Sequence, residues 1–268
     1  MIVSDIAVED SSVKNLERPA LSVVLPAYNE SDTVQKVIER SLLVLEETTD
    51  AYELIVVDDG SIDDTYQKAR TISAKNPRVK VVRNISNMGK GSAVKTAAEF
   101  TNGTAVVVLD ADLEIDPAQL RQYVEVLKDY DMCIASKRHP ESTYYAPPMR
   151  KFLSVSFNKL VRIMTGIRFV DSQTGFKAIR GEHFRTIMDT ILVKRYAYDV
   201  EVLAVAQLMH LRIAELPVKI NQNSRFSSKA VLYMFIDLLG ISYRLRVLKW
   251  YQKRLRGGRK DYEPILRI

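Results

Sequence analysis

The chain has few of the residues that would indicate a disulfide, a zinc site or a membrane span. Its 268 residues include one cysteine, Cys133, which excludes an internal disulfide and a cysteine-based zinc cluster and indicates a reducing compartment. The three histidines, His139, His183 and His210, are too scattered to form a recognisable metal motif. Long apolar runs are missing, so the sequence predicts neither a signal peptide nor a transmembrane helix. The polar, acidic residues 1–19 are expected to form a flexible lead-in.

Two common nucleotide-binding motifs are also missing. No Walker A sequence occurs, and 89-GKGSAV-94 lacks the third small residue of the dinucleotide fingerprint and does not directly follow a predicted strand. The net charge of +6 comes from the C-terminal end, because residues 244–260 hold eight cations and no acid. The remainder is slightly acidic. This distribution favours an acidic surface as partner and speaks against a nucleic-acid-binding protein.

Strand-like and helix-like segments alternate through the first half of the chain. Apolar strands are predicted at 21–25, 53–57, 79–84 and 104–109 and around a buried, inert Cys133, and helices at about 31–47, 63–76 and 87–100. Short apolar strands that alternate with helices are typical of a mainly parallel sheet with helices on both faces. The sequence therefore predicts a Rossmann-like α/β domain.

Carboxylates follow three of these strands. Glu30 comes after the first strand, Asp58 and Asp59 after the second, and Asp110 and Asp112 after the fourth. Ligands of such sheets bind beyond the carboxyl ends of the strands. In an extended chain Asp110 and Asp112 point to the same side, where each raises the pKa of the other unless a cation lies between them. An isolated Asp-x-Asp is more often an acidic turn, but three acidic strand ends on one rim favour a binding site.

Several motifs together resemble the inverting glycosyltransferases of family 2, which have the GT-A fold. The segments are 24-VLPAYNE-30, 56-VVDDGS-61, 87-NMGKGSA-93 and 110-DAD-112. The polyprenyl-phosphate glycosyltransferases are indicated by the later stretch 171-DSQTGFKAIR-180. Dolichyl-phosphate glucose synthases are favoured over mannose synthases by 195-RYAYDVEVL-203 and 237-DLLGISYRLRVL-248. The resemblance covers roughly residues 20–250. It implies transfer of a hexose from a nucleotide sugar, with UDP-glucose favoured, to a polyprenyl (dolichyl) phosphate for protein N-glycosylation or other glycan assembly.

The resemblance also implies roles for individual residues. It assigns nucleotide-sugar binding to Pro26, Tyr28, Glu30, Val56, Asp58, Asp110, Ala111, Asp112 and Lys229. A Mg²⁺ or Mn²⁺ ion is expected on Asp110, Asp112 and Glu114, and catalysis is assigned to Asp110, Asp112 and Arg138. The acceptor phosphate is expected to bind Arg138, Arg150, Ser154, Lys177 and Arg225. Mannose synthases have an arginine where this chain has Asn223, and Arg225 is the expected substitute.

The chemistry of such a transfer explains why these residue types are needed. A nucleoside diphosphate leaves readily once a hard cation on carboxylate oxygens neutralises its charge. A phosphate monoester has a second pKa of about 6, so the acceptor oxygen is already ionised near neutral pH and needs no general base. The remaining demand is to hold two anions together, and arginine suits it because its guanidinium binds phosphate oxygens in pairs.

Residues 231–268 are expected to form a membrane-associating segment after a catalytic domain over residues 20–230. The apolar stretch 231–247 is interrupted by Asp237 and is shorter than the ~20 residues that a membrane span needs. As a helix that continues past residue 247, it has an apolar face formed by Leu238, Ile241, Leu245 and Leu248 and a basic face formed by Arg246, Lys249, Lys253 and Arg256. This composition is typical of a helix lying on anionic lipid, so we expect a peripheral enzyme on the cytoplasmic face of a membrane. The alternative is an ordinary amphipathic helix packed on the catalytic domain.

Three other functions are compatible with these patterns. The first is a dolichyl-phosphate mannose synthase that uses GDP-mannose. The second is a transferase that builds a glycolipid or polysaccharide, although the Gln-x-x-Arg-Trp signature of processive synthases is missing. The third is a non-catalytic membrane-tethered adaptor, against which the two aspartates of 110-DAD-112 speak. A membrane-protein partner or a homo-oligomer is left open, as are UDP-N-acetylglucosamine as donor and the choice between dolichol and undecaprenol.

Overall fold

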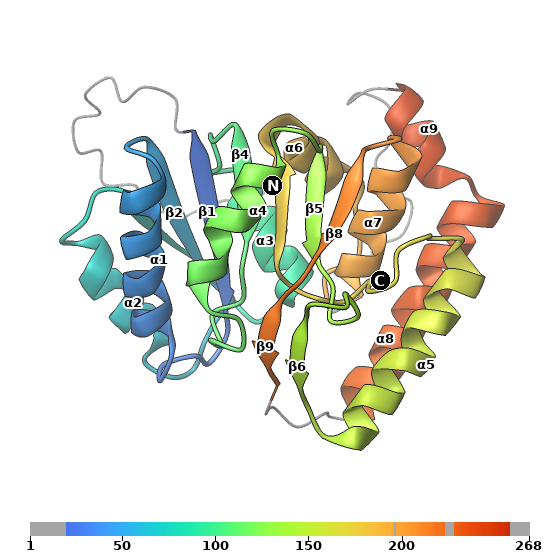
Figure 1. The fold of residues 1–268 in the computed structure, drawn as a ribbon, viewed down its shortest axis with the longest axis horizontal. Helices are drawn as coiled ribbons and strands as arrows, with labels where there is room; N and C mark the ends of the chain where they lie inside the picture. Colours follow the sequence, from blue (N-terminus) through green and yellow to red (C-terminus); the bar gives the residue numbers. More distant parts are fainter. Residues whose placement is uncertain (1–19, 196, 223–227, 258–268) are drawn as a thin grey trace.

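The computed structural model describes residues 20–195, 197–222 and 228–257, apart from the side chains of residues 228–230. In this part of the chain a seven-stranded sheet has the order β3-β2-β1-β4-β7-β5-β8 (Figure 1). The strands are β1 (Leu21–Ala27), β2 (Tyr52–Asp58), β3 (Val79–Arg83), β4 (Ala105–Val108), β5 (Met132–Ala135), β7 (Lys177–Arg180) and β8 (Ile213–Leu216). Neighbouring strands are parallel, except that β7 is antiparallel to both β4 and β5. A second, parallel pair joins β6 (Thr143–Tyr145) to β9 (Lys219–Asn221).

Helices cover both faces of the main sheet (Figure 1). They are α1 (Val34–Thr48), α2 (Thr65–Ser73), α3 (Lys90–Ala98), α4 (Leu120–Val126), α5 (Pro148–Thr165), α6 (Gly181–Thr190), α7 (Tyr198–Leu208), α8 (Ser228–Ser242) and α9 (Trp250–Gly257). A short 3₁₀ turn, Pro117–Gln119, precedes α4, and a π-helical segment, Tyr243–Val247, follows α8. None of the described helices combines the length and apolarity needed to cross a bilayer.

Two apolar cores, one on each face of the sheet, explain the runs of valine and leucine in the strands. Along β4, Val106 and Val108 lie in the core shared with α3, α6 and α7, whereas Val107 lies in the core shared with α1 and α4. In β1, Val24 belongs to the first core and Val23 to the second. Successive side chains of a strand point to opposite faces, so a strand covered on both faces needs a continuous apolar run. The predicted mainly parallel sheet with helices on both faces is confirmed.

The single cysteine lies where the sequence predicts. Cys133 is fully buried in β5, and its thiol lies 3.1 Å from the carbonyl oxygen of Tyr123. Burial raises the pKa of the Cys133 thiol to about 12. Because the thiolate is the reactive form, this thiol is inert, as expected.

The C-terminal helical region departs from the single helix that the sequence predicts. α8 ends at Ser242, and Lys249 adopts a φ of +49°, which is uncommon for a residue other than glycine and separates the π-helical segment from α9. Of the predicted apolar face, Leu238, Ile241 and Leu245 are buried in the core, whereas Leu248 is exposed. That face therefore packs on protein, as in the alternative interpretation of the sequence.

A buried carboxylate attaches this region to the sheet domain. Glu201 is fully buried in α7 and accepts hydrogen bonds from the backbone N–H groups of Leu192 and Val193. The hydroxyl of Tyr251 in α9 donates to the same carboxylate, and a guanidinium nitrogen of Arg244 lies 3.5 Å from it. Burial of a carboxylate is tolerated when it is hydrogen bonded and paired. Glu201 therefore connects α7 to the π-helical segment and to α9.

Candidate active site

An acidic turn directly follows β4 at the carboxyl edge of the parallel strands. Asp110, Asp112 and Glu114 line a small pocket together with Gly175 and Gln222, among others. The backbone N–H of Glu114 donates to Asp112 Oδ1 at 2.9 Å. Leu113 between them has a φ of +58°, which leucine rarely adopts. Strained backbone of this kind is typical of functional sites, where the surrounding structure holds it in place.

The carboxylates of this turn are close enough to perturb one another. Burial, then the charges of Asp110 and Glu114, raises the pKa of Asp112 to about 7. Burial also raises the pKa of Glu30, with Thr33 acting in the opposite direction and Asp110 and Glu114 adding to the increase. The structure thus brings together the acidic residues that the sequence assigns to the donor and the metal. A group of carboxylates that repel one another attracts a cation.

One such cation belongs to the chain. The Lys90 ammonium, at the start of α3, lies 2.5 Å from Asp110 Oδ1 and 2.7 Å from Oδ2. Burial acts to lower the pKa of Lys90, but Asp110, Asp199 and Asp112 raise it above its ordinary value. Lys90 is therefore charged at neutral pH and neutralises part of the acidic turn. No role is predicted for Lys90 from the sequence, although it stands in the motif 87-NMGKGSA-93.

Asp59 places Lys90 beside the acidic turn. This buried carboxylate accepts hydrogen bonds from the side-chain amide of Asn84 and the backbone N–H groups of Met88 and Gly89. Gly89 has a φ of +95°, and a Cβ there would lie 2.6 Å from the carbonyl oxygen of Lys194, so only glycine fits. Asp59, the second aspartate of 58-DDGS-61, thus positions Lys90. The sequence motif alone did not indicate this role.

The expected nucleoside side of the site is formed by the loops after β1 and β2. Asn29, with a φ of +54°, accepts a hydrogen bond from the backbone N–H of Ile62 and donates its own N–H to Ser61 Oγ. Tyr28 is 40% exposed beside this loop. The first acid of the second motif, Asp58, is fully buried and lies 3.0 Å from Arg83 Nε. The side chains of Pro26, Val56 and Ala111 are buried in or beside the strands.

The stretch 171-DSQTGFKAIR-180 forms the framework under the acidic turn. Asp171 is buried and accepts hydrogen bonds from the backbone N–H of Lys137 and from Thr174 Oγ1. The N–H and hydroxyl of Ser172 both donate to Asn158 of α5. A Cβ at Gly175 would overlap the carboxylate of Asp110, so glycine is needed for the acidic turn to approach. These contacts connect the turn after β5, helix α5 and the acidic turn.

Lys177 is buried, although the resemblance implies that it binds the acceptor phosphate. Its side chain is 2% exposed in β7, and its ammonium lies 2.5 Å from Asp199 Oδ1 and donates to the carbonyl oxygen of Thr174. Burial lowers the pKa of Lys177, and Asp199 acts in the opposite direction. Binding an acceptor phosphate requires an accessible ammonium, whereas the structure commits this one to a buried ion pair.

A cluster of cations surrounds Tyr144 in β6, next to the acidic turn. The ammonium groups of Lys137 and Lys151 lie 5.6 and 5.4 Å from the ring centroid of Tyr144, within the range of a cation–π contact. Burial raises the pKa of the Tyr144 hydroxyl, although the charges of Arg150 and Arg138 act to lower it. The Tyr144 hydroxyl donates to Gln222, which lines the acidic pocket. We call Lys137, Arg138, Arg150 and Lys151 around Tyr144 the Tyr144 cluster.

The Tyr144 cluster unites two predicted residues with two that the sequence analysis missed. Arg138, which follows β5, and Arg150, in the first turn of α5, were assigned to the acceptor phosphate; Ser154 lies one turn further along α5. Lys137 and Lys151 carry no motif, and only their positions next to the two arginines could have indicated them. Two further expected residues fall outside what is described: Arg225 lies outside the described residues, as does the side chain of Lys229 in α8.

The acidic turn fits a divalent cation only in part. Carboxylate oxygens are the ligands that Mg²⁺ and Mn²⁺ prefer, and the raised pKa of Asp112 reflects burial beside other carboxylates, which Lys90 offsets only partly. In the described part of the chain, however, no three such side chains converge into a complete metal site. A cation here would therefore need further oxygen ligands, and the phosphates of a nucleotide are the natural source.

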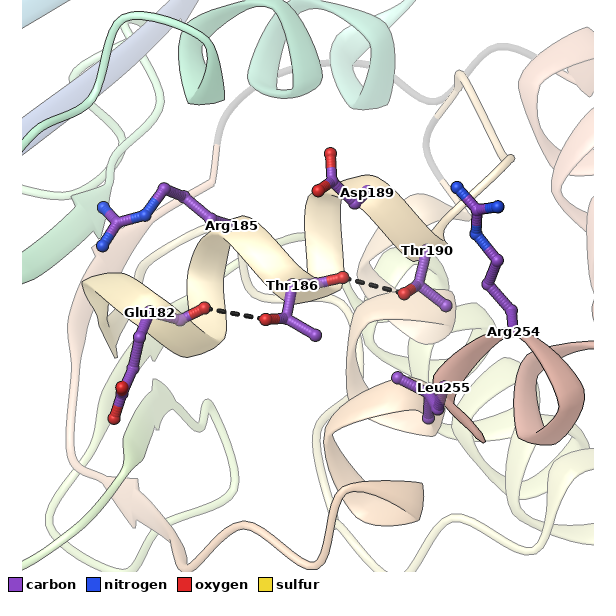
Figure 2. Close-up of a pocket in the computed structure, with 7 residues that line it drawn as sticks. All are labelled: Glu182, Arg185, Thr186, Asp189, Thr190, Arg254 and Leu255. Atoms are coloured by element: carbon purple, nitrogen blue, oxygen red, sulfur yellow. Dashed lines mark hydrogen bonds between the residues drawn. The ribbon is translucent and has the colours of Figure 1, made fainter. Parts of the chain in front are cut away.

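A second hollow lies away from the acidic turn. It is bordered by Arg185, Asp189 and Thr190 of α6 and by Arg254 of α9 (Figure 2). The hydroxyls of Thr186 and Thr190 donate back to the preceding helical turn. No residue that the sequence assigns to donor, metal or acceptor borders this hollow, so it is separate from the candidate active site.

Comparison with known proteins identifies the family. A family model described as glycosyl transferase family 2 matches residues 22–188. Dolichyl-phosphate beta-glucosyltransferase ALG5C of Trichomonas vaginalis is 31% identical, over 86% of this chain and 73% of that protein. The dolichyl-phosphate beta-glucosyltransferase of Mus musculus is 34% identical, over 88% of this chain and 79% of that protein. Glycosyltransferase AglD of Haloferax volcanii is 32% identical, but this chain spans only 38% of it.

Solved structures agree with the fold. Glucosyl-3-phosphoglycerate synthase of Mycobacterium tuberculosis, in complex with UDP, superposes with a TM-score of 0.64 at 21% identity, over 84% of this chain and 80% of that chain. The same enzyme with Mn²⁺, UDP and phosphoglyceric acid gives 0.65 at 20% identity, over 84% and 78%. This likeness extends to the fold and confirms the predicted GT-A architecture. Because the family model matches more than half of this chain, the chain belongs to glycosyl transferase family 2.

Proposed function

We propose that this glycosyltransferase moves glucose from UDP-glucose to dolichyl phosphate, with inversion at the sugar. The activity named for the relatives from Trichomonas vaginalis and Mus musculus supports both the sugar and the lipid acceptor. The observation that carries the proposal is that the acidic turn lies next to the basic Tyr144 cluster. Gln222 lines the acidic pocket and accepts the hydrogen bond of Tyr144, so the acidic turn and the Tyr144 cluster adjoin. An anionic donor, bound together with a metal cation, would meet an anionic acceptor at this boundary.

The acidic turn is the proposed donor side. Asp110 and Asp112 would hold Mg²⁺ or Mn²⁺ against the donor diphosphate, and Glu114 would support them. The bound ion would neutralise the charge that develops on the leaving diphosphate. The Lys90 ammonium keeps Asp110 oriented and adds positive charge beside the diphosphate. Tyr28 and Glu30 would contact the nucleoside from the loop after β1.

The Tyr144 cluster is the proposed acceptor side. Arg138 and Arg150 would bind the phosphate oxygens of the acceptor, with Lys137 and Lys151 lowering the repulsion between the two substrates. The acceptor phosphate is largely a dianion at neutral pH, so its oxygen can attack the sugar without a general base. What these residues contribute is alignment of the two reacting groups and shielding of charge, and alignment alone can supply several kcal/mol of the barrier reduction.

A direct assay tests the proposed function. Purified protein is incubated with Mg²⁺ or Mn²⁺ and with UDP-glucose, UDP-N-acetylglucosamine or GDP-mannose, in the presence and absence of a short, water-soluble isoprenyl phosphate. We expect glucosyl transfer that requires both the metal and the isoprenyl phosphate. Preferred use of GDP-mannose would support the mannose synthase alternative. Turnover of the donor at the same rate with and without the isoprenyl phosphate would contradict the assignment of a polyprenyl phosphate as acceptor.

Arg150→Ala tests the acceptor side separately. The variant is expected to raise the KM for the isoprenyl phosphate about tenfold or more, because a charge-assisted hydrogen bond of roughly 1.5–3 kcal/mol is lost, while the KM for UDP-glucose changes little. Arg121→Ala removes an exposed arginine from α4 and serves as the control. If the KM of the donor rises and that of the acceptor does not, Arg150 belongs to the donor side.

We also propose that the enzyme acts at the cytoplasmic face of a membrane as a peripheral protein. A dolichyl acceptor is held in a bilayer by its chain, so the Tyr144 cluster must reach the phosphate at the lipid surface. The cations of α9, which include Arg254 and Arg256, suit an anionic surface, near which each cation contributes about 1 kcal/mol.

A further inference from the structure

Helix α8 is apolar on both its inner and its outer side. Its inner side, with Leu238 and Ile241, is buried in the protein. The outer side continues without a charge through a row of exposed residues, which are Leu232, Phe235, Ile236 and Leu239 of α8 and Tyr243 at the start of the π-helical segment. A helix that is apolar on both its inner and its outer side is normally covered on both, by a protein core or by lipid. The outer row of α8 is therefore exposed, although its apolar composition suits a protein core or lipid.

Helix α5 extends this apolar surface. It packs beside α8, and Ser242 donates to the carbonyl oxygen of Met164 where the two helices end together. Figure 1 shows the pair along one edge of the molecule, on the opposite side from α1 and α2. The N-terminal half of α5 exposes Met149, Phe152 and Val155, with Phe152 66% exposed. We call these three residues and the outer row of α8 the α5–α8 surface. Exposed apolar side chains on two helices that pack together indicate an interaction site.

The charges around the α5–α8 surface are almost all positive. Helix α5 has four cations and no acid: Arg150, Lys151, Lys159 and Arg162. The one acid of α8, Asp237, is mostly buried and lies 3.8 Å from Arg195. The π-helical segment and α9 add cations and no acid. A partner for this surface should therefore be apolar in its interior and anionic at its boundary.

We infer that the α5–α8 surface inserts into the headgroup region of an anionic lipid bilayer and holds the Tyr144 cluster at the depth of the lipid phosphates. This inference rests on the proposed function and identifies the surface that brings the enzyme to its acceptor. A bilayer offers an apolar interior and an anionic boundary in one partner. The surface is also continuous with the acceptor side, since Arg150 and Lys151 lie in the same turns of α5 as Met149 and Phe152.

The geometry also fixes which side of α8 faces the lipid. Leu238 and Ile241 are buried on its inner side, so the outer row is the side available to a bilayer. Tyr243 at one end of this row is an aromatic residue of the kind enriched at membrane interfaces. The face that the sequence alone predicts to meet lipid is thus the opposite of the one that the structure exposes.

A vesicle experiment tests the inference without donor or acceptor. Wild type and the double variant Phe152→Gln/Leu239→Gln are sedimented with phosphatidylcholine vesicles that contain a minority of phosphatidylglycerol. The variant is expected to lower the binding constant about tenfold or more, since two large apolar side chains are withdrawn from lipid. The control Leu43→Gln/Ile85→Gln removes two exposed apolar residues outside the α5–α8 surface and should bind like wild type. Thermal unfolding confirms that all forms are folded.

Added salt separates the two parts of the interaction. Salt should weaken binding of all forms by screening the cations, whereas the ratio between wild type and the Phe152→Gln/Leu239→Gln variant should persist because the apolar part is not screened. Equal binding of these two forms would overturn the inference, and so would failure of wild type to bind protein-free vesicles. A wild-type dimer that the variant abolishes, with vesicle binding unchanged, would assign the surface to a second copy of the chain. Transfer to a short soluble acceptor is measured separately, so a failed inference leaves the proposed function standing.

Discussion

Replacing Asp112 with asparagine is expected to reduce glucosyl transfer about 10²-fold or more while leaving the protein folded. Asp112 and Asp110 are the two carboxylates that would hold the cation against the diphosphate, and a cation at a leaving group is worth several kcal/mol of transition-state stabilisation. The measurement is kcat/KM for UDP-glucose and a short isoprenyl phosphate at saturating Mg²⁺ or Mn²⁺. Removing the metal with a chelator should abolish the activity of the wild type as well.

Asp116→Asn is the matched control for this substitution. Asp116 belongs to the same acidic segment, but it is exposed, pairs with Arg40 on the surface and caps the 3₁₀ turn by accepting a hydrogen bond from the N–H of Ala118. Asparagine caps helices about as well as aspartate, so this variant should keep full activity. Wild-type turnover by Asp112→Asn, or equal losses in both variants, would contradict the assignment of the acidic turn to the metal.

The Asp112→Asn substitution should also stabilise the metal-free protein at neutral and higher pH. The pKa of Asp112 is raised in the folded state from its ordinary value of 3.8 to about 7. The folded protein therefore keeps a proton that the unfolded chain releases, and stability falls as the pH rises through this interval. The uncharged asparagine side chain carries no such penalty, so in EDTA at about pH 8 the variant should unfold roughly 2–4 °C higher, corresponding to about 1 kcal/mol. Below about pH 4 the difference should vanish, because Asp112 is then protonated in both states.

The parts of the fold that the sequence predicts are those set by local pattern. Val106, Val107 and Val108 form an apolar run that only a strand covered on both faces explains, and the acidic residues after it fall at the carboxyl edge by the geometry of parallel strands. The acidic part of the site could therefore be located before the structure was known. Its residue roles came from the resemblance to family 2.

The parts that sequence reasoning missed depend on pairing between distant segments. Strand β7 enters the sheet antiparallel between β4 and β5, and its four residues carry no local sign of that position. The Tyr144 cluster exists because β6 pairs with β9, a strand far along the chain. The ion pair of Lys90 with Asp110 depends on Asp59, which holds the turn before α3. No periodicity within a short window contains these contacts.

Replacing Lys177 with methionine is expected to lower the free energy of unfolding by about 3–5 kcal/mol, because the substitution leaves a buried carboxylate without its partner. The Lys177 and Asp199 side chains are 2% and 5% exposed, and their charged atoms lie 2.5 Å apart. At roughly 2–4 °C per kcal/mol, the unfolding temperature should fall by about 10 °C. Thermal unfolding of the purified variant, without metal or nucleotide, measures this effect.

A double-mutant cycle distinguishes a buried ion pair from a phosphate ligand at this position. If the pair is structural, Lys177→Met/Asp199→Asn should be more stable than Lys177→Met alone, because the second substitution removes the uncompensated charge. The KM for the isoprenyl phosphate should then change little when it is measured well below the unfolding temperature. A phosphate ligand predicts the reverse: a small loss of stability, a large rise in the KM of the acceptor, and no rescue by Asp199→Asn. Burial of Lys177 between β4 and β5 favours the first outcome, since the ammonium would have to leave Asp199 to reach a phosphate.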